Sequence, residues 1–305
     1  MGKNYAESSL KRFLKRKVKI TLGVVVSFLI TGVVGFAANL PFTEEQLKEQ
    51  EIISEKSDTE KAEYFLNGYN EIKNINDFKT EGDIFTSNAG KINVKKEKEE
   101  IKITLSEFEL ENYNKDITLK KENLTEKTTK NIEKALTLVE KNGFTEKIQN
   151  NVNNGIFIHR ELFEESLINN GIFISNGAGQ KVQDNESSYN YGVIINTADN
   201  NSSQLIDQNS ANIYNFGLLY STSKGQGQKI FGKDIESSTL YNYGTIIAKL
   251  GSAQYAEGNF IKINLLNYGI INAFSNGQLL VGQTRNTENT NLINYGIITG
   301  KTGQR

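Results

Sequence analysis

The stretch STLYNYGTII, residues 238–247, decides the fold, because the chain repeats it in nearly the same form. Aligned on one glycine, seven windows appear, with gaps of 16, 21, 25, 27, 25 and 27 residues. Asn stands two positions before the glycine in every window, and an aliphatic residue or Phe stands two after it. The aligned residues are Asn153, Asn169, Asn190, Asn215, Asn242, Asn267 and Asn294, and Gly155, Gly171, Gly192, Gly217, Gly244, Gly269 and Gly296.

Each window has the period of a strand. From four residues before the glycine to two after it, every second position reads aliphatic, Asn, Gly and aliphatic, which predicts that these four share one face. One unit cannot fold alone. Burial of two or three aliphatic side chains contributes roughly 4–9 kcal/mol, whereas ordering about twenty-five residues of backbone costs on the order of 25–50 kcal/mol. Neighbouring units must therefore stack on one another.

Stacking places like residues in columns about 4.8 Å apart. A column of Asn is then expected, because each amide donates to one neighbour and accepts from the other. Glycine permits a close backbone approach or a positive φ at the corner. Further apolar runs at 204–206, 229–231, 259–263 and 278–281 suggest a second sheet. We predict a mainly β chain whose residues 151–305 form a parallel β-helix of about seven coils. Units this short exclude a propeller, whose blades need about forty residues.

Composition divides the chain near residue 150. Residues 1–150 hold 25 Lys/Arg and 25 Asp/Glu, whereas residues 151–305 hold 10 and 11. The net charge of −1 gives no indication of a nucleic-acid partner. The absence of Cys excludes disulfides, thiol nucleophiles and Cys-based metal sites. His159 is the only histidine, so a multi-His metal site is excluded, and we interpret it as a surface residue at the end of a strand.

The N-terminus has the pattern of a secretory signal peptide. Residues 1–19 carry seven Lys/Arg and one Glu, and residues 20–38 carry no charge. Gly35 and Ala37 supply the small residues before the cleavage site, which we place after Ala37. The alternative is a retained membrane anchor, because nineteen apolar residues are long enough to span a bilayer. We favour cleavage, since glycine, serine and threonine dilute the run and no positive cluster follows it.

The sequence predicts that residues 38–150 form a charged segment of helices and strands that is mostly exposed to solvent. Thr43 and Gln46 form a capping-box signature, followed by a helix with a break near Asn67-Gly68. Alternating strands are expected in KINVK, IKITLSEFEL and DITLKK. Helical spacing returns at 129–143 and ends at Asn142-Gly143.

The signal segment SLKRFLKRKVKITLGVVVSFLITG resembles the N-terminus of autotransporter surface proteins of the type V secretion class, and the NYGII repeats resemble their passenger β-helices. The resemblance covers roughly 1–37 and 151–305. It implies export to the cell surface or outer membrane of a Gram-negative bacterium, or secretion, and often adhesion and virulence. It also implies a C-terminal membrane barrel. Because no such strand pattern occurs up to residue 305, we interpret the chain as the product of a truncated gene, as a fragment, or as the N-terminal portion of a longer adhesin.

Parallel β-helices also support enzymes that cleave acidic polysaccharides, so a glycan lyase or hydrolase is the alternative function. Such enzymes gather carboxylates from neighbouring coils in one groove. Here the acidic residues stand at unlike offsets from the aligned glycine. They are Asp184, Glu186, Asp199, Asp207, Asp234, Glu236, Glu257 and Glu288. We therefore expect no catalysis, no metal and no cofactor.

An aromatic stripe is the candidate interaction site. The residue before the aligned glycine is aromatic in the last five windows, at Tyr191, Phe216, Tyr243, Tyr268 and Tyr295. If Asn and Gly face inward, these rings lie on the opposite face as an exposed stripe that suits protein or glycan contacts. The alternative is a structural stack covered by loops or by the preceding helices. The expected partners are a host-cell or bacterial surface protein or glycan, the export machinery and an outer-membrane translocator.

Overall fold

The computed structural model describes residues 41–66, 82–87, 90–160, 167–182, 185–207, 210–284 and 290–305. The predicted signal peptide, residues 1–37, lies outside these ranges, as does the predicted helix break at Asn67-Gly68. Among the described residues, Thr43–Glu55 belong to one compact unit, and Pro41 and Phe42 belong with Lys56–Arg305 to a second.

Two short helices open the described chain, each with its own cap. Helix α2 (Glu44–Glu55) begins at the predicted capping box: Thr43 N–H donates to Gln46 Oε1 at 3.0 Å, and Gln46 N–H donates to Thr43 Oγ1 at 3.3 Å. Helix α3 (Asp58–Leu66) begins at a second capping box, formed by Ser57 and Glu60, which the sequence analysis did not identify.

A small α/β module follows. Strands β1 (Gly82–Ser87), β2 (Gly90–Lys96), β3 (Glu100–Ser106) and β4 (Lys115–Lys120) form an antiparallel sheet in that order. Two 3-10 turns, η2 (Glu111–Tyr113) and η3 (Lys121–Asn123), flank β4. Helix α4 (Glu126–Asn142) begins at Thr125, whose side chain accepts from Thr128 N–H, and ends at Gly143, where φ is +62°.

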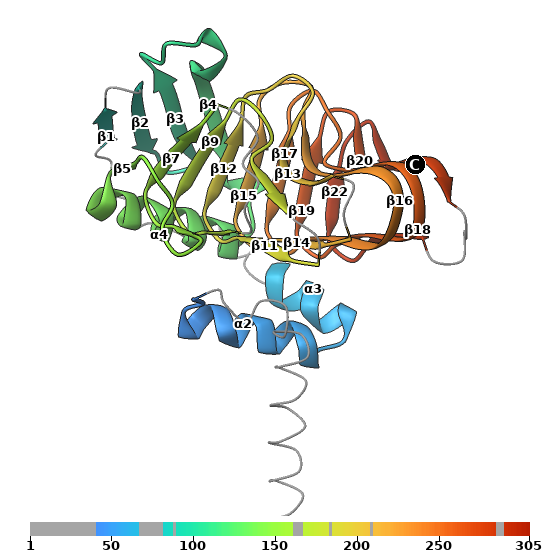
Figure 1. Ribbon diagram of the computed structural model, residues 1–305. Helices are drawn as coiled ribbons and strands as arrows, with labels where there is room; N and C mark the ends of the chain where they lie inside the picture. Colours follow the sequence, from blue (N-terminus) through green and yellow to red (C-terminus); the bar gives the residue numbers. More distant parts are fainter. Residues whose placement is uncertain are drawn as a thin grey trace, which may run out of the picture. The chain divides into compact units, whose positions relative to one another are not determined.

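The remaining chain forms a parallel β-solenoid of two sheets, as predicted (Figure 1). In the described residues the first sheet has eight strands: β5 (Phe144–Thr145), β7 (Ile156–His159), β9 (Ile172–Ser175), β12 (Val193–Asn196), β15 (Leu218–Ser221), β17 (Thr245–Ala248), β19 (Ile270–Ala273) and β22 (Ile297–Thr299). The second comprises β6 (Val152–Asn153), β8 (Ile168–Asn169), β10 (Gln180–Val182), β11 (Ser187–Asn190), β13 (Ser202–Asp207), β14 (Asn212–Asn215), β16 (Gln226–Asn242), β18 (Gln254–Asn267), β20 (Asn276–Thr284), β21 (Thr290–Asn294) and β23 (Thr302–Gln304).

The repeat windows stack in the predicted register. Asn215 pairs with Asn190 on one side and with Asn242 on the other, and the same register continues to Asn294. The solenoid has about five turns, fewer than the seven coils predicted. The first two windows are only 16 residues apart, and their strands β6 and β8 contain two residues each, so the coils at this end are smaller than the later ones.

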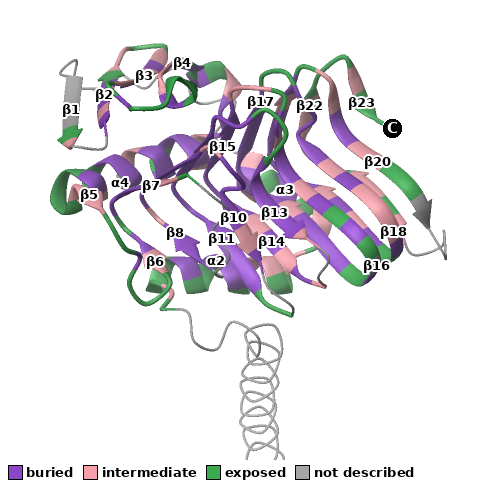
Figure 2. Ribbon diagram, turned by 45° about the horizontal axis from the view of Figure 1, so that its top comes forward, coloured by how far each residue is buried: buried purple, intermediate pink, exposed green. Residues whose placement is uncertain are grey.

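The hydrophobic core crosses the predicted domain boundary at residue 150. Strand β5 precedes that boundary but already belongs to the eight-stranded sheet. Alternate residues of this sheet face the solenoid interior, and those between them pack against α4 and the antiparallel sheet. This outer layer includes Ile132, Leu136 and Val139 of α4, Ile92, Ile103 and Leu119 of the small sheet, and Ile156, Ile172, Val193 and Leu218 of the solenoid. The expectation that 38–150 is mostly exposed was therefore wrong for this module, because its apolar residues pack against part of the eight-stranded sheet. Figure 2 shows the buried residues along α4.

The aligned glycines are required for close approach rather than for a positive φ. A Cβ built on Gly244 would collide with the carbonyl oxygen of Gly217, and a Cβ on Gly269 would collide with that of Gly244. The column begins at the cap of α4: Gly143 O accepts from Ile156 N–H at 2.8 Å, as Gly155 O accepts from Ile172 N–H at 3.0 Å. The backbone of each corner glycine is thus in direct contact with the glycine of the next coil.

Substitution of Gly244 by Ala should therefore destabilise the protein. A methyl group in this close-packed column must displace backbone, and overpacking of this kind costs about 1–3 kcal/mol. The free energy of unfolding, measured by urea titration followed by circular dichroism, should fall by that amount. Gly303→Ala is the control, because nothing lies within 4 Å of a Cβ at that position. Equal effects of the two substitutions would contradict the role assigned to the column.

Candidate functional site

The aligned asparagines form a continuous ladder of side-chain hydrogen bonds inside the solenoid. Each Nδ2 donates to the Oδ1 of the asparagine in the next coil, and most also donate to a backbone carbonyl there, such as Asn215 to Thr245 O at 3.2 Å. The amide–amide distances are 2.7–2.8 Å from Asn153 through Asn169, Asn190, Asn215, Asn242 and Asn267 to Asn294. All of these side chains except Asn294 are buried.

A second ladder, of glutamines, runs in the opposite direction. Gln204 Nε2 donates back to Gln180 Oε1 at 2.6 Å, and the pattern continues through Gln228, Gln254, Gln278 and Gln304 at 2.5–2.9 Å. The sequence contains a signal for it that we missed, namely Gln preceded each time by Gly, Ser or Ala at spacings of 24 or 26 residues. The two ladders leave few polar groups of the interior without a partner.

The aromatic stripe forms a stack of parallel rings, and the stack is mostly covered. Successive centroids from Tyr191 through Phe216, Tyr243 and Tyr268 to Tyr295 lie 4.7, 5.2, 4.8 and 5.2 Å apart. Their exposed fractions are 6, 0, 1, 2 and 37 % in the same order. The interpretation as an exposed stripe is therefore wrong for the first four rings and holds only for Tyr295. The other four rings form the covered structural stack that was the alternative interpretation.

Helix α3 supplies the central part of the cover. Phe65 is fully buried, with its ring centroid 4.6 Å from that of Tyr243 and 6.0 Å from that of Phe216. From α4, Lys127 Nζ lies 5.7 Å from the Phe65 ring centroid, within range of a cation–π contact. The structure thus brings a helix far upstream in the sequence onto the stripe.

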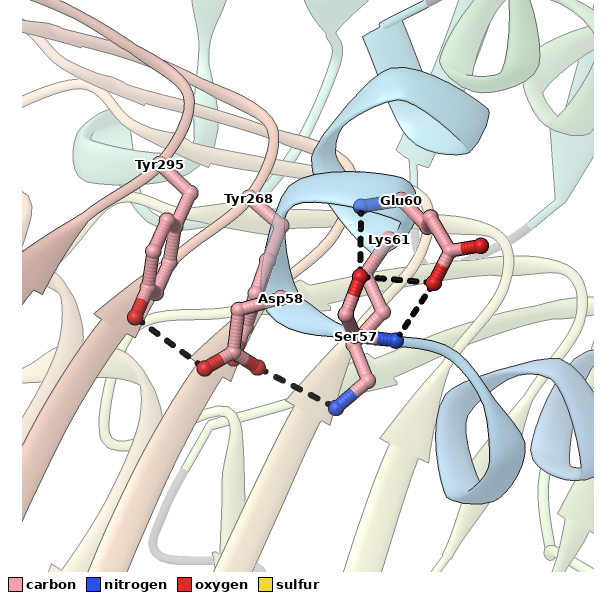
Figure 3. A network of polar contacts seen from close by, with 6 residues as sticks. All are labelled: Ser57, Asp58, Glu60, Lys61, Tyr268 and Tyr295. Carbon is pink, nitrogen blue, oxygen red and sulfur yellow. Dashed lines mark hydrogen bonds and ion pairs between the residues drawn. The ribbon is translucent and has the colours of Figure 1, made fainter.

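Asp58, at the start of α3, joins the last two rings (Figure 3). Its Oδ1 accepts from Tyr268 Oη at 2.8 Å, and its Oδ2 accepts from Tyr295 Oη at 3.0 Å. Lys61 Nζ donates to Oδ1 at 3.2 Å. Sequence analysis could not identify Asp58, because its partners lie 210 and 237 residues away.

These contacts change the pKa of both partners. Partial burial acts to raise the pKa of Asp58, but hydrogen bonds from Tyr268, Lys61 and Tyr295 outweigh it and hold the pKa below its usual value of 3.8. Burial and the Asp58 carboxylate both raise the pKa of Tyr268. Burial raises the pKa of Tyr243 well above its usual value, and the Tyr243 hydroxyl has no hydrogen-bond partner among the described residues.

A different face of the solenoid carries exposed apolar side chains. On the outer surface of β16 and β18, Phe231 stands in register with Glu257, and Lys229 with Tyr255. Lys229 Nζ lies 4.8 Å from the Phe231 ring centroid and 5.5 Å from that of Tyr255. Val281 of β20 pairs with Glu257 of β18. Phe231 and Val281 are both exposed. This mixed apolar and charged surface, which we call the outer strand face, is open to contact.

The structure places His159 and some of the acidic residues considered for catalysis. His159 ends β7, as predicted, but it is half-buried rather than a surface residue, with its ring 5.7 Å from that of Phe157. Asp207 pairs with Lys181 at 3.3 Å, whereas Glu257 stands two strands away from Asp207 in the same sheet. Within the described ranges, no group of three His, Cys, Asp or Glu side chains is arranged to hold a metal ion. Asp184 and Glu288 lie outside those ranges.

None of the helices in the described residues combines the length and apolar character needed to cross a membrane. No protein-family model, no curated protein and no solved structure matches this chain.

Removal of one amide from the asparagine ladder should destabilise the fold. Asn215→Ala leaves the Oδ1 of Asn242 and the carbonyl of Thr245 without their donor, and buried groups left unpaired cost about 1–3 kcal/mol each. We expect the free energy of unfolding in urea to fall by about 2–5 kcal/mol. The control is Asn154→Ala, which removes an exposed amide next to the ladder residue Asn153. It should change the free energy of unfolding by less than about 0.5 kcal/mol. A small effect of Asn215→Ala would contradict a stabilising ladder.

The contribution of Asp58 should depend on pH. Because its folded-state pKa is lowered, the carboxylate stabilises the fold fully above the usual pKa of 3.8, and this stabilisation is lost as the pH falls through the lower folded-state value. At neutral pH, wild type should therefore be more stable to urea than Asp58→Asn. Below pH 3.8 the difference should shrink. A difference of constant size across this range would show that the charge of Asp58 is not involved.

Proposed function

We propose that this chain is an exported, non-catalytic surface protein, and that its solenoid is the N-terminal passenger portion of an autotransporter-like adhesin. The observation that carries the proposal is the parallel β-solenoid with its two internal amide ladders. Such a stack is stabilised along its whole length without cysteine, which suits a protein that must persist outside the cell. The basic and apolar N-terminal sequence supports export by the same reasoning.

The distribution of acidic side chains supports a structural role over an enzymatic one. Glycan-cleaving β-helices need carboxylates that converge on one groove. Asp207 is paired with Lys181, and the Tyr255 hydroxyl is hydrogen-bonded to Glu257, so these carboxylates already have partners on the outer strand face. We therefore propose binding rather than bond cleavage as the activity of the chain.

The outer strand face is the contact surface we propose for adhesion. It presents Phe231, Val281 and Tyr255 beside Lys229 and Glu257, a combination of rings, aliphatic groups and charges that suits a protein or glycan on a host or bacterial cell. Because the strands beneath it are held in register by the glutamine ladder, the face is rigid before it meets a partner.

Export is tested by expression of the full chain in a Gram-negative host. N-terminal sequencing of the exported form should give a start at Ala38, with antibodies against 151–305 labelling intact cells of the native organism. Ala37→Asp should block processing, because the peptidase requires a small residue there. A start at Met1, or a chain that stays in the cytoplasm, would contradict the export proposal.

Adhesion and the absence of catalysis are tested on the exported form. It should bind cells, and the double substitution Phe231→Ser with Val281→Ser should weaken this binding. It should release no product from uronate polymers.

A further inference from the structure

The surface beneath α3 has the properties of a helix-binding site. The stacked rings of Phe216, Tyr243 and Tyr268 form an apolar strip along the solenoid, and the hydroxyl groups of Tyr268 and Tyr295 at its end donate hydrogen bonds to a carboxylate. The occupant, α3, is nine residues long. A helix of this length is not stable alone in water, so contacts with the strip hold it in shape.

Two residues of α3, Asp58 and Phe65, contact the rings, Ala62 between them is buried, and the spacing of the three fits one face of a helix. Asp58, Ala62 and Phe65 stand at positions i, i+4 and i+7. Asp58 binds the tyrosine hydroxyls, Ala62 is buried, and Phe65 packs on Tyr243. A carboxylate, a small residue and an aromatic ring at these intervals are the chemistry that the strip recognises.

The present occupant fits the strip incompletely. The hydroxyl of Tyr243 is buried and has no hydrogen-bond partner in the described residues, whereas those of Tyr268 and Tyr295 are both paired. A buried donor without an acceptor is unfavourable, and it regains water when the cover leaves. Departure of α3 would let water reach the Tyr243 hydroxyl, which offsets part of the contacts that Phe65 and Asp58 lose.

We propose that the aromatic strip is a helix-binding surface that residues 58–66 occupy in cis, and that it also binds a helical segment of another polypeptide with the same three anchors. The partner carries Asp or Glu at one position, a small residue four positions later and an aromatic residue seven positions later. This interaction is separate from the outer strand face and does not depend on the proposed adhesive function.

The probe for this proposal is a labelled peptide with the sequence of residues 57–66, SDTEKAEYFL. Fluorescence anisotropy measures its binding to the whole chain and to the whole-chain variant Phe65→Ala, whose own helix is weakened. We expect at least tenfold tighter binding to the variant, because the wild-type helix competes for the strip. The same peptide with Ala in place of its Phe should bind neither chain.

Two matched tyrosines serve as controls in the Phe65→Ala background. Tyr268→Phe removes a hydroxyl that binds Asp58 and should weaken the peptide several-fold, whereas Tyr243→Phe removes the unpaired hydroxyl and should not weaken it. Equal affinity for wild type and Phe65→Ala would overturn the proposal. If Phe65→Ala loses its β-sheet circular dichroism, Asp58→Asn replaces it. In wild type, amides of 58–66 should exchange with deuterium faster than those of β14, and equally slow exchange would also overturn it.

Discussion

The side-chain amides inside the solenoid impose the constraint on which the rest of the structure depends. An amide in a closed interior must have both a donor and an acceptor partner. Asn215 meets this requirement only when Asn190 and Asn242 lie directly beside it. A shift of one residue in any coil would turn its amide to the outer face and leave its neighbours unpaired. The ladders thus fix the register, and the register aligns the rings and the glycines.

The two ladders also oppose each other electrically. The asparagine amides donate toward the C-terminal coils, whereas the glutamine amides donate toward the N-terminal coils. Aligned amide dipoles strengthen one another along a column, as they do in a helix. Because the columns run in opposite directions, their fields partly cancel, and the interior carries two ordered polar rows without a large net dipole.

Sequence alone predicted the asparagine and glycine columns, but it missed the repeated glutamines and the elements that do not repeat. The columns of Asn242 and Gly244 followed from seven similar windows, and the small-residue–Gln signal was as regular but lacked a conspicuous motif around it. The position of α3 could not be predicted, because Asp58 and Tyr268 are joined by a single hydrogen bond across 210 residues. Exposure of the stripe depended on that same helix. Burial of a repeated surface is decided by the elements that do not repeat.

The outer layer shows this dependence along one column. Tyr220 and Ile247 belong to the core shared with the α/β module, whereas Asn272 and Thr299, the next residues in the same column, are polar and at least partly exposed. The change from apolar to polar marks the end of the covered zone. The change from apolar to polar residues along one column of paired positions therefore indicates how far the neighbouring element covers the sheet.

The cap of α4 has a consequence for the order of assembly. Gly143 ends the helix and, through its carbonyl oxygen, receives the first strand of the stack. A chain that is synthesised or translocated with its N-terminal part first would complete a helical platform before any coil is needed. Each turn would then close onto a finished one, with only some twenty-five residues of loop entropy to overcome at each step. With that order of synthesis, Gly143 would be the point at which winding of the coils begins.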